Sequence, residues 1–99
     1  MNIKFENYLG QNIGFGGFKL GARDAYDSAR NIEHIFCQRT GWFQKPKPIP
    51  IKELRAAYKI LCPDMDRAFP GVIDKIVQVE IVRQLGFITD ENGNVSYPA

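Results

Sequence analysis

The fold is decided by residues 50–99, which read PIKELRAAYKILCPDMDRAFPGVIDKIVQVEIVRQLGFITDENGNVSYPA. Apolar side chains recur at three- and four-residue spacing from Pro50 to Leu61, which predicts an amphipathic helix opened by proline. Pro63 begins a second, shorter helical segment whose acidic residues suit a helix N-terminus. The predicted order is therefore helices first, followed by a β-hairpin that turns at Asn92-Gly93.

Residues 72–85 are compatible with two secondary structures. Apolar residues surround a helical wheel here, yet residues 77–81 also alternate with the period of a strand and are rich in β-branched side chains. We choose the helix because Gly86 stands where a left-handed cap belongs, with Phe87 placed to fold back over it. A helix that is apolar on most sides must be buried on most sides, so it is predicted to be the central core element.

The register of the C-terminal hairpin has two alternatives. A two-residue loop at Asn92-Gly93 places Ile88 opposite Tyr97, whereas a four-residue loop from Asp90 to Gly93 places Ile88 opposite Val95. Both leave one apolar face, so the hairpin itself is predicted either way.

Residues 1–43 are predicted to form a short strand, a glycine-rich region and a long helix. Residues 2–6 alternate apolar and charged side chains, as a half-buried strand does. Five glycines within residues 10–21 cost too much backbone entropy for a helix, which predicts a loop or a tight, bent pair of strands. From Ala22 onward the apolar residues form one helical stripe, and Gly41 ends that helix.

Residues 44–50 connect this half to residues 51–99. Three alternating prolines predict an extended connector without helix or ladder hydrogen bonds. We therefore expect a single α+β domain over residues 1–99, mostly helical, with a C-terminal β-hairpin. Three helices followed by a hairpin resemble a winged helix-turn-helix, a shape that binds nucleic acid or protein, so the C-terminal half is expected to be winged-helix-like.

The composition is that of an ordinary globular protein. The chain has 99 residues, 44% of them hydrophobic and 24% charged, which suits one domain with a modest core. No apolar run reaches the length of a membrane span and the start lacks a signal-peptide pattern, so we expect a cytoplasmic protein without membrane association. A net charge of +2 creates no strong field for a polyanion.

The sequence favours a non-enzymatic protein that needs no metal and no cofactor. His34 is the only histidine and falls on the polar face of its predicted helix, while Cys37 and Cys62 suit small buried thiols. No second histidine or clustered cysteine stands at metal-ligand spacing. The glycine run at residues 14–17 lacks the last glycine of the dinucleotide fingerprint, because Lys19 occupies that position.

A basic and aromatic segment is the strongest binding candidate, since no acidic residue lies between Glu33 and Glu53. Basic side chains neutralise phosphates and exposed rings stack on bases, so the segment suits nucleic acid. The same rings and prolines also suit a protein interface. Alternatively, Trp42 and Phe43 close the core while the lysines solubilise a linker. The predicted binding residues are Arg39, Trp42, Lys45, Lys47 and Lys52.

A recognition helix would supply secondary contacts. If residues 72–85 form the second helix of a helix-turn-helix, Gln78 can read adenine, and Lys75 can bind guanine or a phosphate. Asp74 beside them and the acidic Asp90-Glu91 hairpin tip oppose DNA binding and fit a protein partner better.

Two functional hypotheses follow. The leading one is a small regulatory binding protein that contacts nucleic acid through the basic segment. The alternative is a protein-binding inhibitor or adaptor of the compact kind that phages and other mobile elements encode. A structural or assembly subunit is a third class, and neither the partner nor the oligomeric state is predicted.

Overall fold

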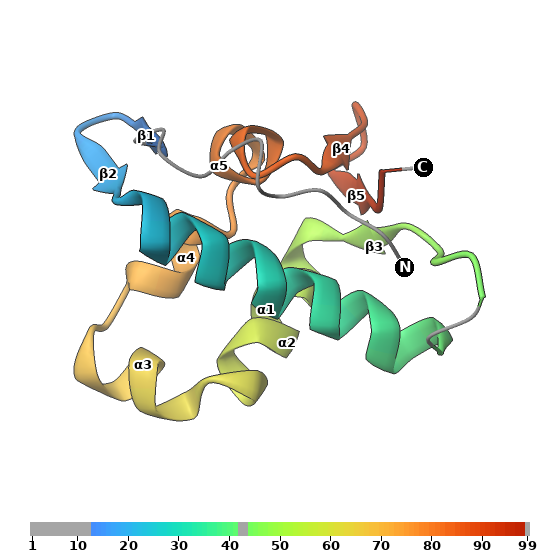
Figure 1. Ribbon diagram of the computed structural model, residues 1–99, viewed down its shortest axis with the longest axis horizontal. Coiled ribbons are helices and arrows are strands. Elements are labelled where there is room, and N and C mark those ends of the chain that lie inside the picture. Colours follow the sequence, from blue (N-terminus) through green and yellow to red (C-terminus); the bar gives the residue numbers. More distant parts are fainter. Residues whose placement is uncertain (1–12, 42–43, 99) are drawn as a thin grey trace.

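The computed structural model describes residues 13–41 and 44–98, and the strand predicted at residues 2–6 lies outside them. Figure 1 shows an α+β fold with two small antiparallel sheets. The elements are β1 (Ile13–Phe15), β2 (Phe18–Leu20), α1 (Ala22–Thr40), β3 (Ile49–Pro50), α2 (Ile51–Leu61), α3 (Pro63–Ala68), α4 (Val72–Ile76), α5 (Val79–Gln84), β4 (Ile88–Thr89) and β5 (Asn94–Ser96).

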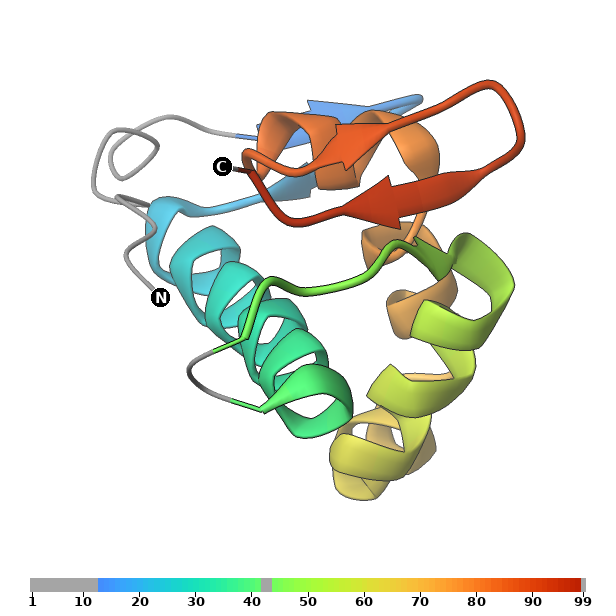
Figure 2. The same ribbon diagram turned by 90° about the vertical axis from the view of Figure 1, so that its right-hand side faces the viewer.

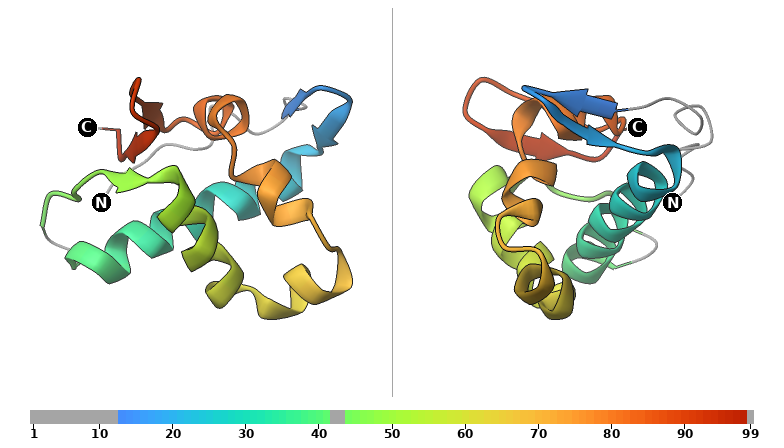
Figure 3. Two further views of the ribbon diagram at one scale, coloured as in Figure 1. Left: turned by 180° about the vertical axis from the view of Figure 1, so that it is seen from behind. Right: turned by 90° about the vertical axis from the view of Figure 1, so that its left-hand side faces the viewer.

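The elements form two layers around one core. The β1–β2 hairpin, α5 and the β4–β5 hairpin lie on one side, and α1, α2, α3 and α4 lie on the other (Figures 2 and 3). Core residues come from both sides of the connector, so the protein is a compact, small single domain. Within the described parts of the chain, no helix combines the length and the hydropathy needed to cross a bilayer.

α1 and α2 follow the predicted patterns. α1 buries its apolar stripe and ends at Gly41, whose φ is 85° and whose N–H donates to the Cys37 carbonyl at 2.8 Å. Positive φ explains why glycine ends this helix. α2 begins after Pro50 and buries Leu54 and Tyr58 in the core.

Residues 72–85 are helical, but they do not form one helix. Val77 leaves the helical region with φ −91° and ψ 68°, and Gln78 is extended with φ −131° and ψ 159°. The predicted continuous helix is therefore wrong at residues 77–78, although helix rather than strand is confirmed on both sides. Two short helices in different directions bury this all-round apolar sequence, whereas one straight helix in so small a domain would expose a side.

The end of α5 matches the predicted glycine cap. Gly86 has φ 103°, its N–H donates to the Arg83 carbonyl at 3.0 Å, and the Phe87 N–H donates to the Val82 carbonyl at 3.0 Å. These two bonds are those of a Schellman motif. They return Phe87 to the core, where it is buried.

β5 lies between β3 and β4 in a three-stranded antiparallel sheet. Ile49 of the connector pairs with Val95, so the prediction that residues 44–50 make no ladder is wrong at their end. The flanking prolines are compatible with this pairing because β3 is an edge strand and needs few N–H donors.

The C-terminal hairpin adopts neither predicted register. Ile88 pairs with Ser96 and Thr89 pairs with Val95, which leaves a three-residue loop at residues 91–93. Gly93 has φ 79°, as the last position of such a loop requires. The Asn92-Gly93 pair alone does not distinguish a three-residue loop from a two-residue or a four-residue loop.

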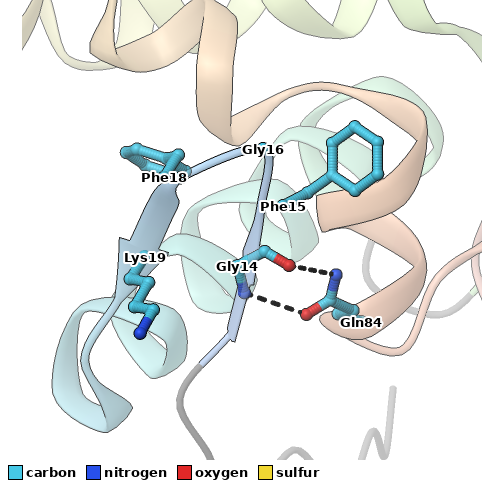
Figure 4. Close-up of a pocket in the computed structure, with 7 residues that line it drawn as sticks. Gly14, Phe15, Gly16, Phe18, Lys19 and Gln84 are labelled. Atoms are coloured by element: carbon cyan, nitrogen blue, oxygen red, sulfur yellow. Dashed lines mark hydrogen bonds between the residues drawn. The ribbon is translucent and has the colours of Figure 1, made fainter.

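The glycine-rich segment was predicted to be either a loop or a pair of strands, and its described part forms the strand pair β1–β2. The Gln84 side chain of α5 bonds to β1 at Gly14: its Oε1 accepts the Gly14 N–H and its Nε2 donates to the Gly14 carbonyl, both at 3.0 Å (Figure 4). The amide thus satisfies the free edge of β1 as a third strand would. Glycine is needed here because a Cβ would lie 2.4 Å from the Phe18 carbonyl oxygen.

Replacing Gln84 by alanine is expected to lower the free energy of unfolding by about 1–2 kcal/mol, because two partly buried hydrogen bonds are lost. Gln84→Glu keeps an acceptor for the Gly14 N–H but repels its carbonyl, so it is expected to destabilise the protein as well. Urea denaturation followed by circular dichroism measures both. Stability equal to that of the wild type in both variants would contradict the role assigned to this amide.

Candidate functional site

The predicted basic segment is only partly available for binding. Arg39 Nη1 lies 3.1 Å from Glu53 Oε2 in an ion pair, and Trp42 lies outside the described residues. Lys45, Lys47 and Lys52 are exposed, and none of them forms an ion pair within residues 13–41 and 44–98. Three of the five predicted contacts thus remain as free cationic groups.

The predicted recognition-helix residues do not share one helix face. Lys75 belongs to α4, where its Nζ lies 5.7 Å from the centre of the Phe18 ring. Gln78 lies in the break before α5, and its Nε2 donates to the Lys75 carbonyl at 2.6 Å. Their placement at the start of one helix was therefore wrong, because the chain leaves the helical conformation between them.

Asp74 forms ion pairs with two basic side chains of α2. Its Oδ1 lies 3.1 Å from Lys59 Nζ and 3.5 Å from Arg55 Nε. The carboxylate thus tethers α4 to α2. Its expected repulsion of a DNA backbone is reduced accordingly.

The acidic hairpin tip is partly used by the turn itself. The Asp90 carboxylate accepts the N–H groups of Asn92 and Asn94 at 2.9 Å and the Asn94 side-chain amide at 3.1 Å. The backbone hydrogen bond from Asn94, followed by that residue's side-chain bond, lowers the pKa of Asp90 below its usual range. Asp90 and Glu91 are both exposed, and Glu91 forms no ion pair within the described residues.

A groove between α1 and the α3–α4 segment was missed by sequence reasoning. We name it the α1–α3 groove; it has a volume of about 380 Å³, and Leu20 and Tyr58 contribute to its lining. Its polar wall is the face of α1 that carries Asp24, Asp27, Ser28 and Asn31 at three- and four-residue spacing.

The opposite wall of the α1–α3 groove is apolar. It consists of Met65, Phe69, Val72 and Ile76. Gly71, with φ 86°, reverses the chain between α3 and α4, and the Val72 N–H donates to the Phe69 carbonyl at 3.1 Å. The turn leaves the Phe69 side chain 65% exposed at the rim.

Polar groups at the base of the groove are held in place. The Asn31 side-chain amide donates to the hydroxyl oxygen of Tyr58 at 3.2 Å. Burial raises the pKa of Tyr58, and the hydrogen bond from Asn31 opposes that rise. The tyrosine is thus kept neutral where α1 and α2 meet.

Replacing Tyr58 by phenylalanine is expected to cost about 1 kcal/mol of unfolding free energy at pH 7, through loss of its partly buried hydrogen bond with Asn31. Because the folded-state pKa is raised, the unfolded state releases its proton first, above about pH 10. Above that pH, the free energy of unfolding of the wild type should fall by up to about 1.4 kcal/mol per pH unit. The variant has no hydroxyl to titrate and should not show this loss. Urea titrations between pH 8 and 11 should show the two stabilities converging, and a constant difference would contradict the prediction.

A second hollow lies between α2 and the C-terminal half of α1. Its volume is about 370 Å³, and its lining includes Ile35, Ala57, Ile60 and Leu61. Ile60 is 81% exposed, so an apolar side chain projects into solvent beside it. Apolar surface is therefore accessible at two places along α1.

Metal-ligating and thiol side chains are scattered over the described residues. Within them, no three His, Cys, Asp or Glu side chains are grouped closely enough to hold a metal ion. Cys37 is buried and Cys62 is half-buried, and both thiols are free. Burial raises the pKa of both, which disfavours the nucleophilic thiolate.

Comparison of the chain with protein-family models, with curated proteins and with solved structures gives no match.

Proposed function

We propose that this protein is a small, non-enzymatic regulatory binding module that acts in the cytoplasm as an inhibitor or adaptor, through contacts with a partner protein. The observation that carries the proposal is the α1–α3 groove, with its apolar wall and the exposed Phe69 at its rim. Exposed apolar surface of this kind is typical of protein interaction sites. Aromatic residues and methionine are also enriched where proteins meet.

The polar wall of the groove favours protein over nucleic acid. Asp24 and Asp27 are exposed carboxylates on that wall, and they would repel phosphates. An aromatic side chain in apolar surroundings is also better suited to contact a protein than to contact a phosphate backbone.

A winged-helix-like arrangement of the C-terminal half belongs to the same proposal. Its support is the order of helices followed by a hairpin, together with β3, which follows α1 and pairs with the last strand. The break at residues 77–78 interrupts the segment expected to serve as a recognition helix, so this framework is proposed as a scaffold for protein contacts.

Nucleic acid binding is the second candidate, and one observation favours it. Lys45, Lys47 and Lys52 are exposed along the connector and the first turn of α2, without ion pairs in the described structure. Cations free of internal partners can release counterions from a phosphate backbone. Such binding would weaken steeply with added salt.

A capture experiment on the full chain separates the two candidates. The wild type, Phe69→Ser, Phe15→Ser and Lys45→Ala/Lys47→Ala are each immobilised and exposed to a nuclease-treated lysate of the organism that encodes the chain. Phe15 is a matched control because it is 55% exposed, lies on β1 and does not line the groove. The proposal expects a partner that survives nuclease and is lost only in Phe69→Ser.

The opposite pattern identifies the second candidate. A partner that nuclease removes and that depends on Lys45 and Lys47 would replace the proposed function by nucleic acid binding. Equal capture by all four proteins would show that neither the α1–α3 groove nor the lysines of the connector bind the partner.

A further inference from the structure

The carboxylates on the α1–α3 groove differ from most others in the described structure. Glu33, Glu53, Asp64, Asp74 and Glu80 each pair with a lysine or an arginine, and Asp90 is bonded within its own turn. Asp24 and Asp27 form no ion pair within residues 13–41 and 44–98, although Arg23 stands four residues before Asp27. Two negative charges on the wall are therefore left for an external cation.

Of the two arginines near these carboxylates on α1, Arg23 forms no ion pair with either of them, and Arg30 is already occupied. Arg30 Nε lies 3.9 Å from Glu33 Oε1, and its Nη1 donates to the Tyr26 hydroxyl at 3.1 Å. The negative potential of Asp24 and Asp27 is thus not cancelled by a bonded neighbour on α1. A partner that brings positive charge would be attracted to this wall.

The apolar wall determines what else the partner must carry. Met65 and Phe69 are four residues apart, as are Val72 and Ile76, so two short rows of apolar side chains face α1. Methionine adapts its shape to a bound side chain, and the exposed Phe69 ring can close over it. The partner therefore needs apolar anchors opposite these rows.

The length of the groove favours a helix as the occupant. Its α1 wall extends from Asp24 to Asn31, a rise of about 10 Å, which is nearly two helical turns. An amphipathic helix lays residues at positions i and i+4 into such a groove and turns the rest outward. Basic residues beside those anchors would reach the carboxylates.

We infer that the α1–α3 groove binds a basic amphipathic helix of a partner protein. Two apolar side chains lie against Met65, Phe69 and Val72, and lysine or arginine side chains pair with Asp24 and Asp27. This inference rests on the proposed function and adds the chemistry of the partner segment.

The test uses two synthetic helical peptides with the same leucine stripe. One carries lysine on its polar face, and the other carries glutamate. Fluorescence anisotropy of each labelled peptide is measured against the full-length wild-type chain, the double variant Asp24→Asn/Asp27→Asn, and Phe69→Ser. A matched double variant, Asp64→Asn/Glu91→Gln, removes two exposed charges outside the groove.

The inference expects the lysine peptide to bind the wild type and the glutamate peptide to bind far more weakly. Loss of both groove carboxylates should weaken the lysine peptide about 2- to 30-fold, the range that two exposed ion pairs can supply. Phe69→Ser should weaken it further, and the Asp64/Glu91 variant should bind as the wild type does.

Several results would overturn the inference. Equal binding of both peptides, or unchanged binding by the Asp24/Asp27 variant, would exclude a basic partner segment. The proposed function would still be supported if the nuclease-resistant partner is captured by the wild type and lost in Phe69→Ser. Wild-type chain that dimerises in sedimentation equilibrium, and is made monomeric by Phe69→Ser, would assign the groove to a second copy. Loss of nuclease-resistant capture as a whole would instead refute the proposed function itself.

Discussion

Replacing Phe36 by alanine is expected to lower the free energy of unfolding by about 3–5 kcal/mol, the range for removing a buried phenylalanine ring. Phe36 is 1% exposed and lies in α1. Its ring stacks on Phe87 with a centroid separation of 5.9 Å and meets the edge of Tyr97 at 5.9 Å. The substitution would therefore empty the site where α1 meets the C-terminal hairpin.

The consequence is large because a domain of this size has a total stability of about 5–15 kcal/mol. Each kcal/mol shifts the melting temperature of a domain this small by about 4–8 °C, so the variant should melt well over 10 °C below the wild type. Thermal and urea denaturation measure the loss. Phe15→Ala is the matched control, since the Phe15 ring is half-exposed and its removal should lower the free energy of unfolding only slightly. A loss below 1 kcal/mol for Phe36→Ala would contradict the assigned core.

Replacing Arg55 by methionine is expected to cost about 2–3 kcal/mol, more than a surface arginine would. The Arg55 guanidinium donates through Nε and Nη2 to the Val77 carbonyl, at 3.3 and 2.9 Å. That carbonyl lies where the chain leaves α4, and the two donors bind it in place of a helix N–H. Methionine keeps the apolar stem but leaves the acceptor without its charged donor.

Two matched variants separate this capping role from the ion pair with Asp74. Asp74→Asn removes the exposed charge contacts and keeps the bonds to Val77, so it should cost less than about 1 kcal/mol. Arg55→Lys keeps a positive charge but offers no planar pair of donors, so an intermediate loss is expected. Urea denaturation of the three variants is the measurement. A loss in Asp74→Asn equal to that in Arg55→Met would show that the ion pair, not the cap, stabilises the break.

Local patterns in the sequence predict the elements whose stability is local. The apolar stripe from Ala22, the proline that opens α2 and the caps at Gly41 and Gly86 all act within a few residues, so each could be predicted without the rest of the chain. The break at residues 77–78 depends instead on a donor from Arg55, which is 22 residues away in sequence.

Contacts that hydrophobic periodicity does not reveal explain the other corrections to the fold. Ile49 joins a ladder only because Val95 lies beside it, and a connector with three prolines carries no sign of that pairing. The hairpin register follows from the three bonds to the Asp90 carboxylate, which hold a three-residue loop. Neither partner can be identified from periodicity.

The candidate site was harder to predict than the fold. The α1–α3 groove combines α1, α2 and the α3–α4 segment, which lie up to about 50 residues apart, and each contributes one wall or the base. One local signal was present: Met65 and Phe69 are spaced for a helix face, yet the segment between Pro63 and Pro70 is too short to bury them. The basic segment, by contrast, was predicted from its charged and aromatic residues, and such a pattern could not reveal that Arg39 pairs with Glu53.

The central claim is that the α1–α3 groove is the surface that binds a partner protein. Hydrogen–deuterium exchange of the chain, with and without the partner captured after nuclease treatment, tests it most directly. α3 and α4 are short helices whose amides should exchange quickly in the free protein, so their protection is a sensitive readout. The claim predicts slowed exchange across residues 63–76, and protection confined to residues 44–52 would contradict it.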